Sequence, residues 1–254
     1  MRTSAVLPIF WVVLVLLLAG CDSGISASQP QTITPTTAPT PTPTFTPTPT
    51  QVANPYPPYT GTLVWNDPLT DNSLGHRWDE SYTNGDSCRF SDGAYQVVAV
   101  PPGSSDCFER AFGSAGQFSN FALQVTVTFL QTHSRNDGMG IYFRADGMGI
   151  PAGKFYYLVL YANGWYFLGS CFPPSGCAGA VALQGVCHIC HFGSTQANTL
   201  GLVANGKHFS FYVNGHKLAS GTDATFSQGL IGLTGNAYTS TSIMAYKNLK
   251  IWRL

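Results

Sequence analysis

Between residues 60 and 254, hydrophobic and polar residues follow one another in short runs that are separated by turn-forming residues. Runs of this length and period are typical of β-strands, whose successive side chains point to opposite faces. No segment shows a helical period. The pattern predicts ten strands, at Leu63–Trp65, Tyr95–Val100, Ala122–Leu130, Gly138–Arg144, Phe155–Tyr161, Trp165–Leu168, Thr199–Val203, His208–Val213, Leu230–Leu233 and Ile243–Trp252. Many short strands at regular spacing indicate an all-β, antiparallel sandwich or barrel.

Three Asn-Gly pairs separate predicted strands, at Asn163-Gly164, Asn205-Gly206 and Asn214-Gly215. This dipeptide is preferred in tight hairpin turns, because both central residues of such a turn take positive φ. We therefore expect a hairpin at each pair.

Several motifs occur in a characteristic order. The first group is Asp67-Pro68-Leu69, Gly75, Trp78 and Phe90-x-Asp92-Gly93-Ala94-Tyr95-Gln96-Val97; it is followed by Gly138–Asp146, Asn198–Leu200, Tyr212–Gly215, Gly229–Leu233 and Tyr246–Trp252. In this order they resemble the concanavalin A-like lectin/glucanase jelly rolls, in particular the laminin-G-like and 3-keto-glycoside-hydrolase-like branches. The resemblance implies an antiparallel jelly-roll β-sandwich over most of residues 60–254. Because these motifs mainly build the fold, they specify function poorly.

Residues 1–20 have the features of a lipoprotein signal peptide. Arg2 provides a positive charge, residues 9–18 are almost purely apolar, and Leu18-Ala19-Gly20-Cys21 matches the bacterial lipobox. The apolar stretch is shorter than the roughly 20 residues that a membrane-spanning helix needs. We expect cleavage before Cys21, diacylglycerol on its sulfur, and a location on the extracytoplasmic side of the cell membrane. The alternative is an ordinary secretory signal with a cysteine nearby.

Residues 21–59 form a predicted stalk. They show no hydrophobic periodicity, and residues 34–50 are close to a Pro-Thr alternation. Proline fixes φ and removes backbone donors, so we expect a disordered, extended polyproline II-like tether rather than a packed core. Its threonines are candidate O-glycosylation sites.

An aromatic face is the candidate binding site. Strand alternation places Ile141 and Phe143 in the core, and the resemblance places Tyr156, Leu158 and Leu160 inward. One outer sheet surface would then carry Tyr142, Arg144, Tyr157, Tyr161, Trp165 and Phe167. Aromatic rings stack on the apolar faces of sugars, and their polar tips bond hydroxyls. The alternative is that the Cys-rich loop at residues 169–192 covers these aromatics and makes a second small core.

Six cysteines follow Cys21: Cys88, Cys107, Cys171, Cys177, Cys187 and Cys190. An even number in an exported domain predicts disulfides. Cys88 and Cys107 flank one strand region, so we expect them to pair. The other four lie in the Gly-, Pro- and Ala-rich loop, whose shape we expect disulfides to hold.

Two other interpretations of the cysteine loop stay open. Cys187-His188-Ile189-Cys190-His191 matches the C-x-x-C-H pattern of c-type haem attachment, in which His191 would bind iron. Cys177, Cys187, Cys190 and a histidine would make a zinc site, although an oxidising compartment disfavours free thiolates. We expect disulfides and no cofactor. Asp137 and Asp146 bracket the strand that carries Arg144, and they are weak candidates for structural calcium; more often such residues cap turns.

Charge and motif content favour a binding module over an enzyme or a nucleic-acid-binding protein. Only 9% of residues are charged and the net charge is zero, so we expect no nucleic-acid partner. The domain has two glutamates, Glu80 and Glu109, and no Glu-x-Asp-x-x-Glu strand, catalytic triad or zinc motif. We therefore predict a monomeric, non-catalytic carbohydrate-binding module. The alternatives are a glycoside hydrolase acting on (3-keto-)glycosides and a protein-interaction or sensory domain.

Overall fold

The computed structural model describes residues 52–254 except 111–115, 148–152, 173–176, 178–182 and 194. Its contacts group Pro49–Leu254 into one compact unit. The other unit, Met1–Thr48, lies outside the described residues, as do Cys21 and the signal peptide. Within the described part of the chain, no helix is long and apolar enough to cross a membrane.

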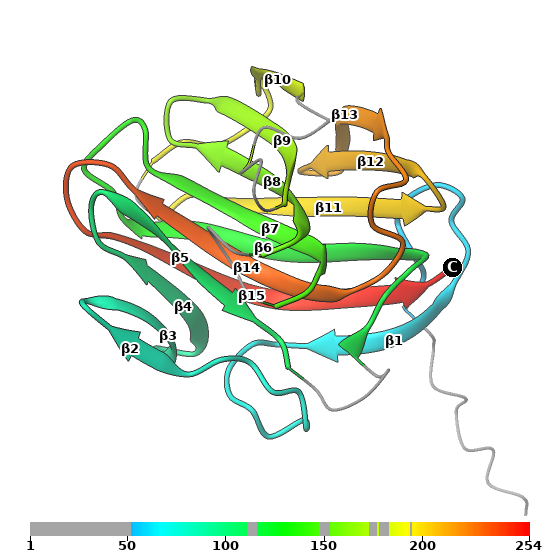
Figure 1. Cartoon of the computed structure of the whole chain (residues 1–254), viewed down its shortest axis with the longest axis horizontal. Coiled ribbons are helices and arrows are strands. Elements are labelled where there is room, and N and C mark those ends of the chain that lie inside the picture. The colour runs from blue at the N-terminus through cyan, green and yellow to red at the C-terminus, as the bar shows by residue number, and fades with distance from the viewer. Residues whose placement is uncertain (1–51, 111–115, 148–152, 173–176, 178–182, 194) are drawn as a thin grey trace, which may run out of the picture. The chain divides into compact units, whose positions relative to one another are not determined.

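In the described part of the chain, fifteen strands form two sheets, and all the pairings between them are antiparallel. Figure 1 shows their arrangement. The nine-stranded sheet, called sheet 1 here, contains β1 (Thr62–Asp67), β2 (Ser81–Thr83), β3 (Asp86–Ser91), β4 (Ala94–Ala99), β6 (Phe121–Gln131), β11 (Ala197–Asn205), β12 (His208–Val213), β13 (His216–Thr222) and β15 (Ser242–Arg253). The six-stranded sheet, called sheet 2, contains β5 (Gly103–Phe108), β7 (Gly138–Ala145), β8 (Phe155–Tyr161), β9 (Trp165–Cys171), β10 (Leu183–Val186) and β14 (Leu230–Ala237). The predicted antiparallel jelly-roll sandwich is confirmed.

Strands that are distant in the sequence are neighbours in both sheets. Sheet 1 has the order β13-β12-β11-β6-β15-β4-β3-β2, with β1 also paired to β15; sheet 2 has the order β10-β9-β8-β7-β14-β5. The first and last strands therefore pair, and β14 lies between β5 and β7. These long-range pairings bring loops from separate parts of the chain to the same end of sheet 2.

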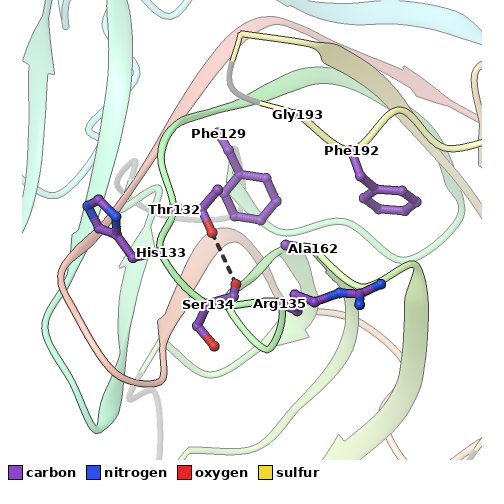
Figure 2. Close-up of a pocket in the computed structure, with 8 residues that line it drawn as sticks. All are labelled: Phe129, Thr132, His133, Ser134, Arg135, Ala162, Phe192 and Gly193. Atoms are coloured by element: carbon purple, nitrogen blue, oxygen red, sulfur yellow. Dashed lines mark hydrogen bonds between the residues drawn. The ribbon is translucent and has the colours of Figure 1, made fainter.

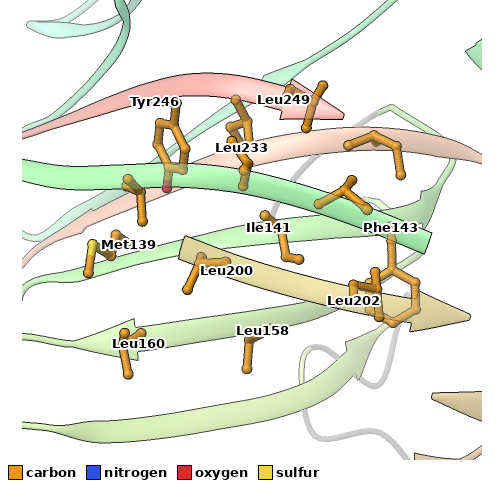
Figure 3. Packing of buried hydrophobic residues seen from close by; sticks show 14 of the residues in the cluster. Met139, Ile141, Phe143, Leu158, Leu160, Leu200, Leu202, Leu233, Tyr246 and Leu249 are labelled. Atoms are coloured by element: carbon orange, nitrogen blue, oxygen red, sulfur yellow. The ribbon is translucent and has the colours of Figure 1, made fainter. Parts of the chain in front are cut away.

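The main core lies between the inner faces of the two sheets (Figure 3). Sheet 2 contributes Ile141 and Leu158, and sheet 1 contributes Leu200 and Leu202; all four are buried. Tyr156, Leu158 and Leu160 lie in this core, as do Ile141 and Phe143. The predicted inward faces of β7 and β8 are confirmed.

Tyr246 of β15 joins the two sheets through a hydrogen bond in the middle of this core. Its hydroxyl lies 2.7 Å from the carbonyl oxygen of Thr234 and 3.0 Å from that of Gly140, and it accepts a 2.9 Å bond from the Gly140 N–H. Burial raises its pKa well above the ordinary tyrosine value. A neutral hydroxyl thus ties sheet 1 to the backbone of β7 and β14.

All ten predicted strands are present, and five further strands appear. The additional strands β2, β3, β5, β10 and β13 are polar or only three to seven residues long, so they have little hydrophobic alternation. The three Asn-Gly pairs connect consecutive strands as expected. Only Asn214-Gly215 has positive φ at both residues; at the other two pairs the glycine alone does.

The segment before β1 packs on the outer face of sheet 1. The Tyr56 ring lies 4.7 Å from that of Tyr212 and is buried against Val203 and Trp252. The Trp252 indole N–H donates a 2.8 Å bond to the Val52 carbonyl oxygen. Tyr56 fills the space above Gly201, which has no side chain. The end of the segment that the sequence assigned to the stalk is therefore part of the folded unit.

The six cysteines form three disulfides: Cys88–Cys107, Cys171–Cys177 and Cys187–Cys190. The expected pair of Cys88 and Cys107 links β3 of sheet 1 to β5 of sheet 2 at one edge of the core. The other two pairs are local within the Cys-rich loop. The prediction that disulfides shape this loop is thus confirmed for its described residues.

Candidate functional site

The outer face of sheet 2 carries the candidate site. The strand registers place one row of outward positions across all six strands, from β5 to β10: Asp106, Thr234, Gly140, Val159, Phe167 and Gln184. A second row runs beside it and contains Ser104, Asn236, Gly138 and Tyr161. Glycines hold the β7 position of both rows, so no β7 side chain stands between the polar side of the face and its aromatic side.

A band of three hollows crosses this face. The first, of about 400 Å³, lies over β8 to β10 and is lined by Tyr161, Trp165, Phe167 and Gln184, among others. The second, of about 330 Å³, lies over β14 and β5 and shares Asn136, Tyr161 and Tyr238 with the first. The third, of about 430 Å³, lies at the β5 edge of this face, between β5 and strands β2 and β3 of sheet 1, and it shares Ser104 with the second. We call this band the groove.

The end of the groove at β8 and β9 is open and aromatic. Trp165 is 46% exposed, while Tyr161 and Phe167 are half-buried. The side chain of Asn163 fixes the turn by accepting a 2.9 Å bond from the Trp165 N–H. Three of the predicted residues, Tyr161, Trp165 and Phe167, therefore lie together in one accessible hollow.

The other end of the predicted aromatic face is covered. Tyr142 is 2% exposed and Tyr157 is 9% exposed, and both pack in a second cluster with Phe108, Phe155 and the Cys171 disulfide. The Tyr157 hydroxyl donates a 3.1 Å bond to the carbonyl oxygen of Cys177 in the Cys-rich loop. The alternative of a second small core, predicted from the sequence, thus applies to Tyr142 and Tyr157 but not to Trp165.

A polar cluster lies where the groove meets this second core. The Tyr142 hydroxyl donates a 2.8 Å bond to the carboxylate of Asp106, and the Thr234 hydroxyl lies 3.0 Å from the same oxygen. Burial, together with the negative charge of Asp106, raises the pKa of Tyr142 well above its ordinary value. Tyr142 therefore acts here as a neutral donor that holds Asp106 at the edge of the groove.

Arg144 does not lie on the predicted face. Its guanidinium donates to the backbone carbonyl oxygens of Ser119, Gly206 and Phe226 at 2.6–2.9 Å, and it stacks over the ring of the core residue Phe209. A register shift in the pairing of β7 with β14, together with φ of +50° at Arg144, interrupts the alternation of side chains. The prediction that Arg144 shares a surface with Tyr142 is wrong for this reason.

The structure also places the cofactor candidates. Cys187 and Cys190 are joined in a disulfide, so neither sulfur is free for a haem thioether or for zinc in this structure. The imidazole Nδ1 of His191 lies 3.2 Å from the Ala197 carbonyl oxygen. Among the described residues, no group of three or more His, Cys, Asp and Glu side chains is placed to hold a metal ion.

The two calcium candidates have different surroundings. The buried Asp137 accepts bonds at 2.9–3.2 Å from the Thr132 hydroxyl and from the N–H groups of His133, Ser134 and Tyr238. This carboxylate therefore caps the turn between β6 and β7. The Asp146 N–H donates a 3.0 Å bond to the Lys154 carbonyl oxygen.

Several groove residues were missed by sequence analysis. Asn136 and Tyr238 lie in the loops after β6 and β14, and Asp106 lies on β5, which was not predicted. No sequence pattern near these residues marks them as part of a site. The long-range pairing of β14 with β5 and β7 brings them to the face of sheet 2 that carries Trp165. The amide oxygen of Asn236, a residue that lines the second hollow, is buried and has no hydrogen-bond partner among the described residues.

No protein-family model and no curated protein matches the sequence. Solved structures do match. The carbohydrate-binding module CBM66 from Bacillus subtilis is 17% identical, with a TM-score of 0.53, over 69% of this chain and 94% of that module. A Bacillus subtilis protein of unknown function with a galectin-like fold is 13% identical, with a TM-score of 0.56, over 76% of this chain and 96% of its own.

A Bacillus licheniformis β-glucanase is similar as well, with 10% identity and a TM-score of 0.55, over 77% of this chain and 99% of the glucanase. Identities this low establish the architecture alone. Two antiparallel sheets in jelly-roll order, together with these neighbours, show that the described part of the chain has the concanavalin A-like fold.

Proposed function

We propose that this chain is a membrane-anchored lipoprotein whose concanavalin A-like domain binds carbohydrate, without cleaving it, in the groove on the outer face of sheet 2. The exposed indole of Trp165 carries the proposal. It stands beside Tyr161 and Phe167 in a hollow of about 400 Å³. Pyranose rings bind such surfaces because their C–H faces are apolar while their rims carry hydroxyls.

The polar side chains of the groove suit the recognition of hydroxyl groups. Asn136, Asn163 and Gln184 line the first hollow, and each amide both donates and accepts hydrogen bonds. Asn236 lines the second hollow and adds another neutral polar side chain to the groove. None of the residues that line the first hollow is charged. The chemistry there is that of stacking and neutral hydrogen bonding.

The carboxylates of the groove are engaged in structural contacts. Asp106 accepts bonds from Tyr142 and Thr234, and Asp86 accepts a 2.7 Å bond from the Val100 N–H. Glycoside hydrolysis needs one carboxylate free as base or nucleophile and a second as acid. These contacts favour a binding module, and the solved neighbours include both a carbohydrate-binding module and a glucanase.

The anchor and the stalk complete the proposal. Cys21 in the lipobox would carry the lipid, and the Pro-Thr alternation after it would hold the domain away from the membrane. Replacing Cys21 by serine should release the protein from the membrane fraction. If the Cys21→Ser protein stayed fully membrane-bound, the proposed anchor would be wrong.

Retention on polysaccharides tests the binding function. The full-length oxidised protein in detergent is passed over a panel of insoluble and immobilised polysaccharides, and the flow-through is assayed for released sugar. We expect retention without sugar release. Trp165→Ala should weaken binding about fivefold or more, since the loss of one stacked ring costs about 1–3 kcal/mol.

Tyr59→Ala is the matched control, because Tyr59 is an aromatic residue in the segment before β1 that is 67% exposed and lines none of the three hollows. It should bind as the wild type does. Retention on no polysaccharide would refute carbohydrate binding. Steady release of sugar would instead establish a glycoside hydrolase.

A further inference from the structure

A further pocket, separate from the three hollows of the groove, is drawn in Figure 2. It has a volume of about 280 Å³, and its walls are the loop between β6 and β7, Ala162 and the segment Phe192–Gly193. Ala162 separates Tyr161 from Asn163, and both of these line the groove. In the β6–β7 loop, Arg135 lines the pocket while its neighbour Asn136 lines the groove. Consecutive residues of two loops thus line the pocket and the groove, which places the two cavities next to each other.

The inner surface of the pocket is aromatic. Phe129 of β6 is buried in the main core and presents its ring to the pocket, and the half-buried Phe192 packs against the same core (Figure 2). Phe129 is only 2% exposed, so the ring on which the C–H face of a sugar could stack is that of Phe192.

The rim of the pocket is cationic. Arg135 is exposed and makes no hydrogen bond or ion pair with any described residue. Its side chain extends towards the Phe192 side of the pocket, whereas His133 lies on the opposite side (Figure 2). Among the residues that line the pocket there is no Asp or Glu. A guanidinium that lacks a protein partner is able to bind an anion in two parallel hydrogen bonds.

The loop that carries Arg135 is fixed in place. The buried carboxylate of Asp137 binds the Thr132 hydroxyl and the N–H groups of His133 and Ser134, and its other oxygen binds the N–H of Tyr238. Tyr238 itself lines the groove. The Asp137 side chain thus fixes the position of the cationic rim of the pocket relative to the groove. This lowers the entropy cost of binding at both sites.

We infer that this pocket takes the carboxylate of an acidic sugar residue that belongs to the glycan bound in the groove. The inference rests on the proposed function. The first hollow of the groove has no charged lining and cannot distinguish an acidic from a neutral sugar by charge. The pocket combines what a uronic acid needs, namely an aromatic surface for the ring and a planar guanidinium for the carboxylate.

The test compares uronic-acid polysaccharides, namely polygalacturonate, alginate and glucuronoxylan, with the same polymers after reduction of their carboxyl groups to primary alcohols. The full-length protein in detergent is used throughout. We expect the wild type to bind at least one acidic polymer about tenfold more tightly than its reduced form. This preference should decrease between low and high salt, because it depends on an ion pair.

Arg135→Gln should remove the preference, weakening binding of the acidic polymer about tenfold and that of the reduced polymer less than twofold. Arg89→Gln is the matched control; Arg89 lies on β3 of sheet 1 and makes only long bonds, of 3.3–3.4 Å, to Gln96. It should keep the preference. Unchanged circular dichroism and melting temperature would show that both variants fold.

Two results would overturn the inference while leaving the proposed function intact. One is equal binding of acidic and reduced polymers by the wild type. The other is an unchanged preference in Arg135→Gln, in a series in which Trp165→Ala still weakens binding. If Trp165→Ala instead bound every polymer as the wild type does, the groove itself would be the wrong site.

Discussion

Replacing Tyr246 by phenylalanine removes one oxygen atom from the centre of the sandwich. The hydroxyl accepts from the Gly140 N–H at 2.9 Å and lies 2.7 Å from the Thr234 carbonyl oxygen, and the residue is fully buried. Water has no access to these backbone groups from the core side. The substitution therefore leaves polar groups of β7 and β14 without this partner, directly beneath the glycine positions of the groove.

The expected loss follows from the two hydrogen bonds. A buried polar group that loses its partner costs about 1–3 kcal/mol, whereas the hydrophobic contacts of the ring are unchanged in phenylalanine. We expect Tyr246→Phe to lower the free energy of unfolding by about 2 kcal/mol. For a domain of this size, each kcal/mol shifts the melting temperature by roughly 2–4 °C, so the midpoint should fall by about 4–8 °C.

Equilibrium unfolding in guanidinium chloride, followed by tryptophan fluorescence, measures this loss. Tyr238→Phe is the control, because Tyr238 is 59% exposed and its hydroxyl is open to water. It should change the free energy of unfolding by less than about 0.5 kcal/mol. A loss for Tyr246→Phe as small as that of the control would refute the claim that this hydroxyl holds the sheets together.

Two further predictions concern alkaline pH and the inter-sheet disulfide. Burial raises the pKa of Tyr95, Tyr142 and Tyr246 well above the ordinary value of about 10, so each contributes stability that is complete below pH 10 and falls by about 1.4 kcal/mol per pH unit above it. Circular dichroism should show cooperative unfolding between about pH 10 and 12, coincident with tyrosinate absorbance; ionisation of these residues without loss of structure would contradict the assignment. Substitution of both Cys88 and Cys107 by alanine should lower the free energy of unfolding by about 3 kcal/mol, because the disulfide joins cysteines 19 positions apart and restricts the unfolded chain. Denaturant unfolding measures this change, and a loss below about 1 kcal/mol would contradict this account.

The strands were predictable where one face of the sheet is buried and hydrophobic alternation is therefore strong. In β8 and β12 the predicted and observed boundaries coincide. The edge strand β13, with its sequence HKLASGT, has no such alternation because most of its side chains face solvent. Alternation thus records burial, and strands held by backbone pairing alone give no comparable pattern.

The candidate site was predictable in part. Alternation and the family resemblance together placed Tyr157, Tyr161 and Phe167 on the outer face, but the coverage of Tyr157 depends on a contact with Cys177 that is 20 residues away. The position of Arg144 depends on a local register shift, which a two-residue period cannot anticipate. Tertiary contacts therefore decide which part of the aromatic face is accessible.

The packing of Tyr56 on sheet 1 determines where mechanical load enters the domain. A pull on the N-terminal segment acts first on the bond between Val52 and the Trp252 indole, and then on the contact of Tyr56 with Tyr212. Both lie on the outer face of sheet 1, on the opposite side of the core from the groove. If the domain binds a glycan and is anchored through its N-terminal segment, as proposed, a force between the glycan and the anchor would pass through the thickness of the sandwich. The pairing of β15 with β6 and the hydrogen bonds of Tyr246 would then carry this force. The force would not act directly on the loops that shape the groove.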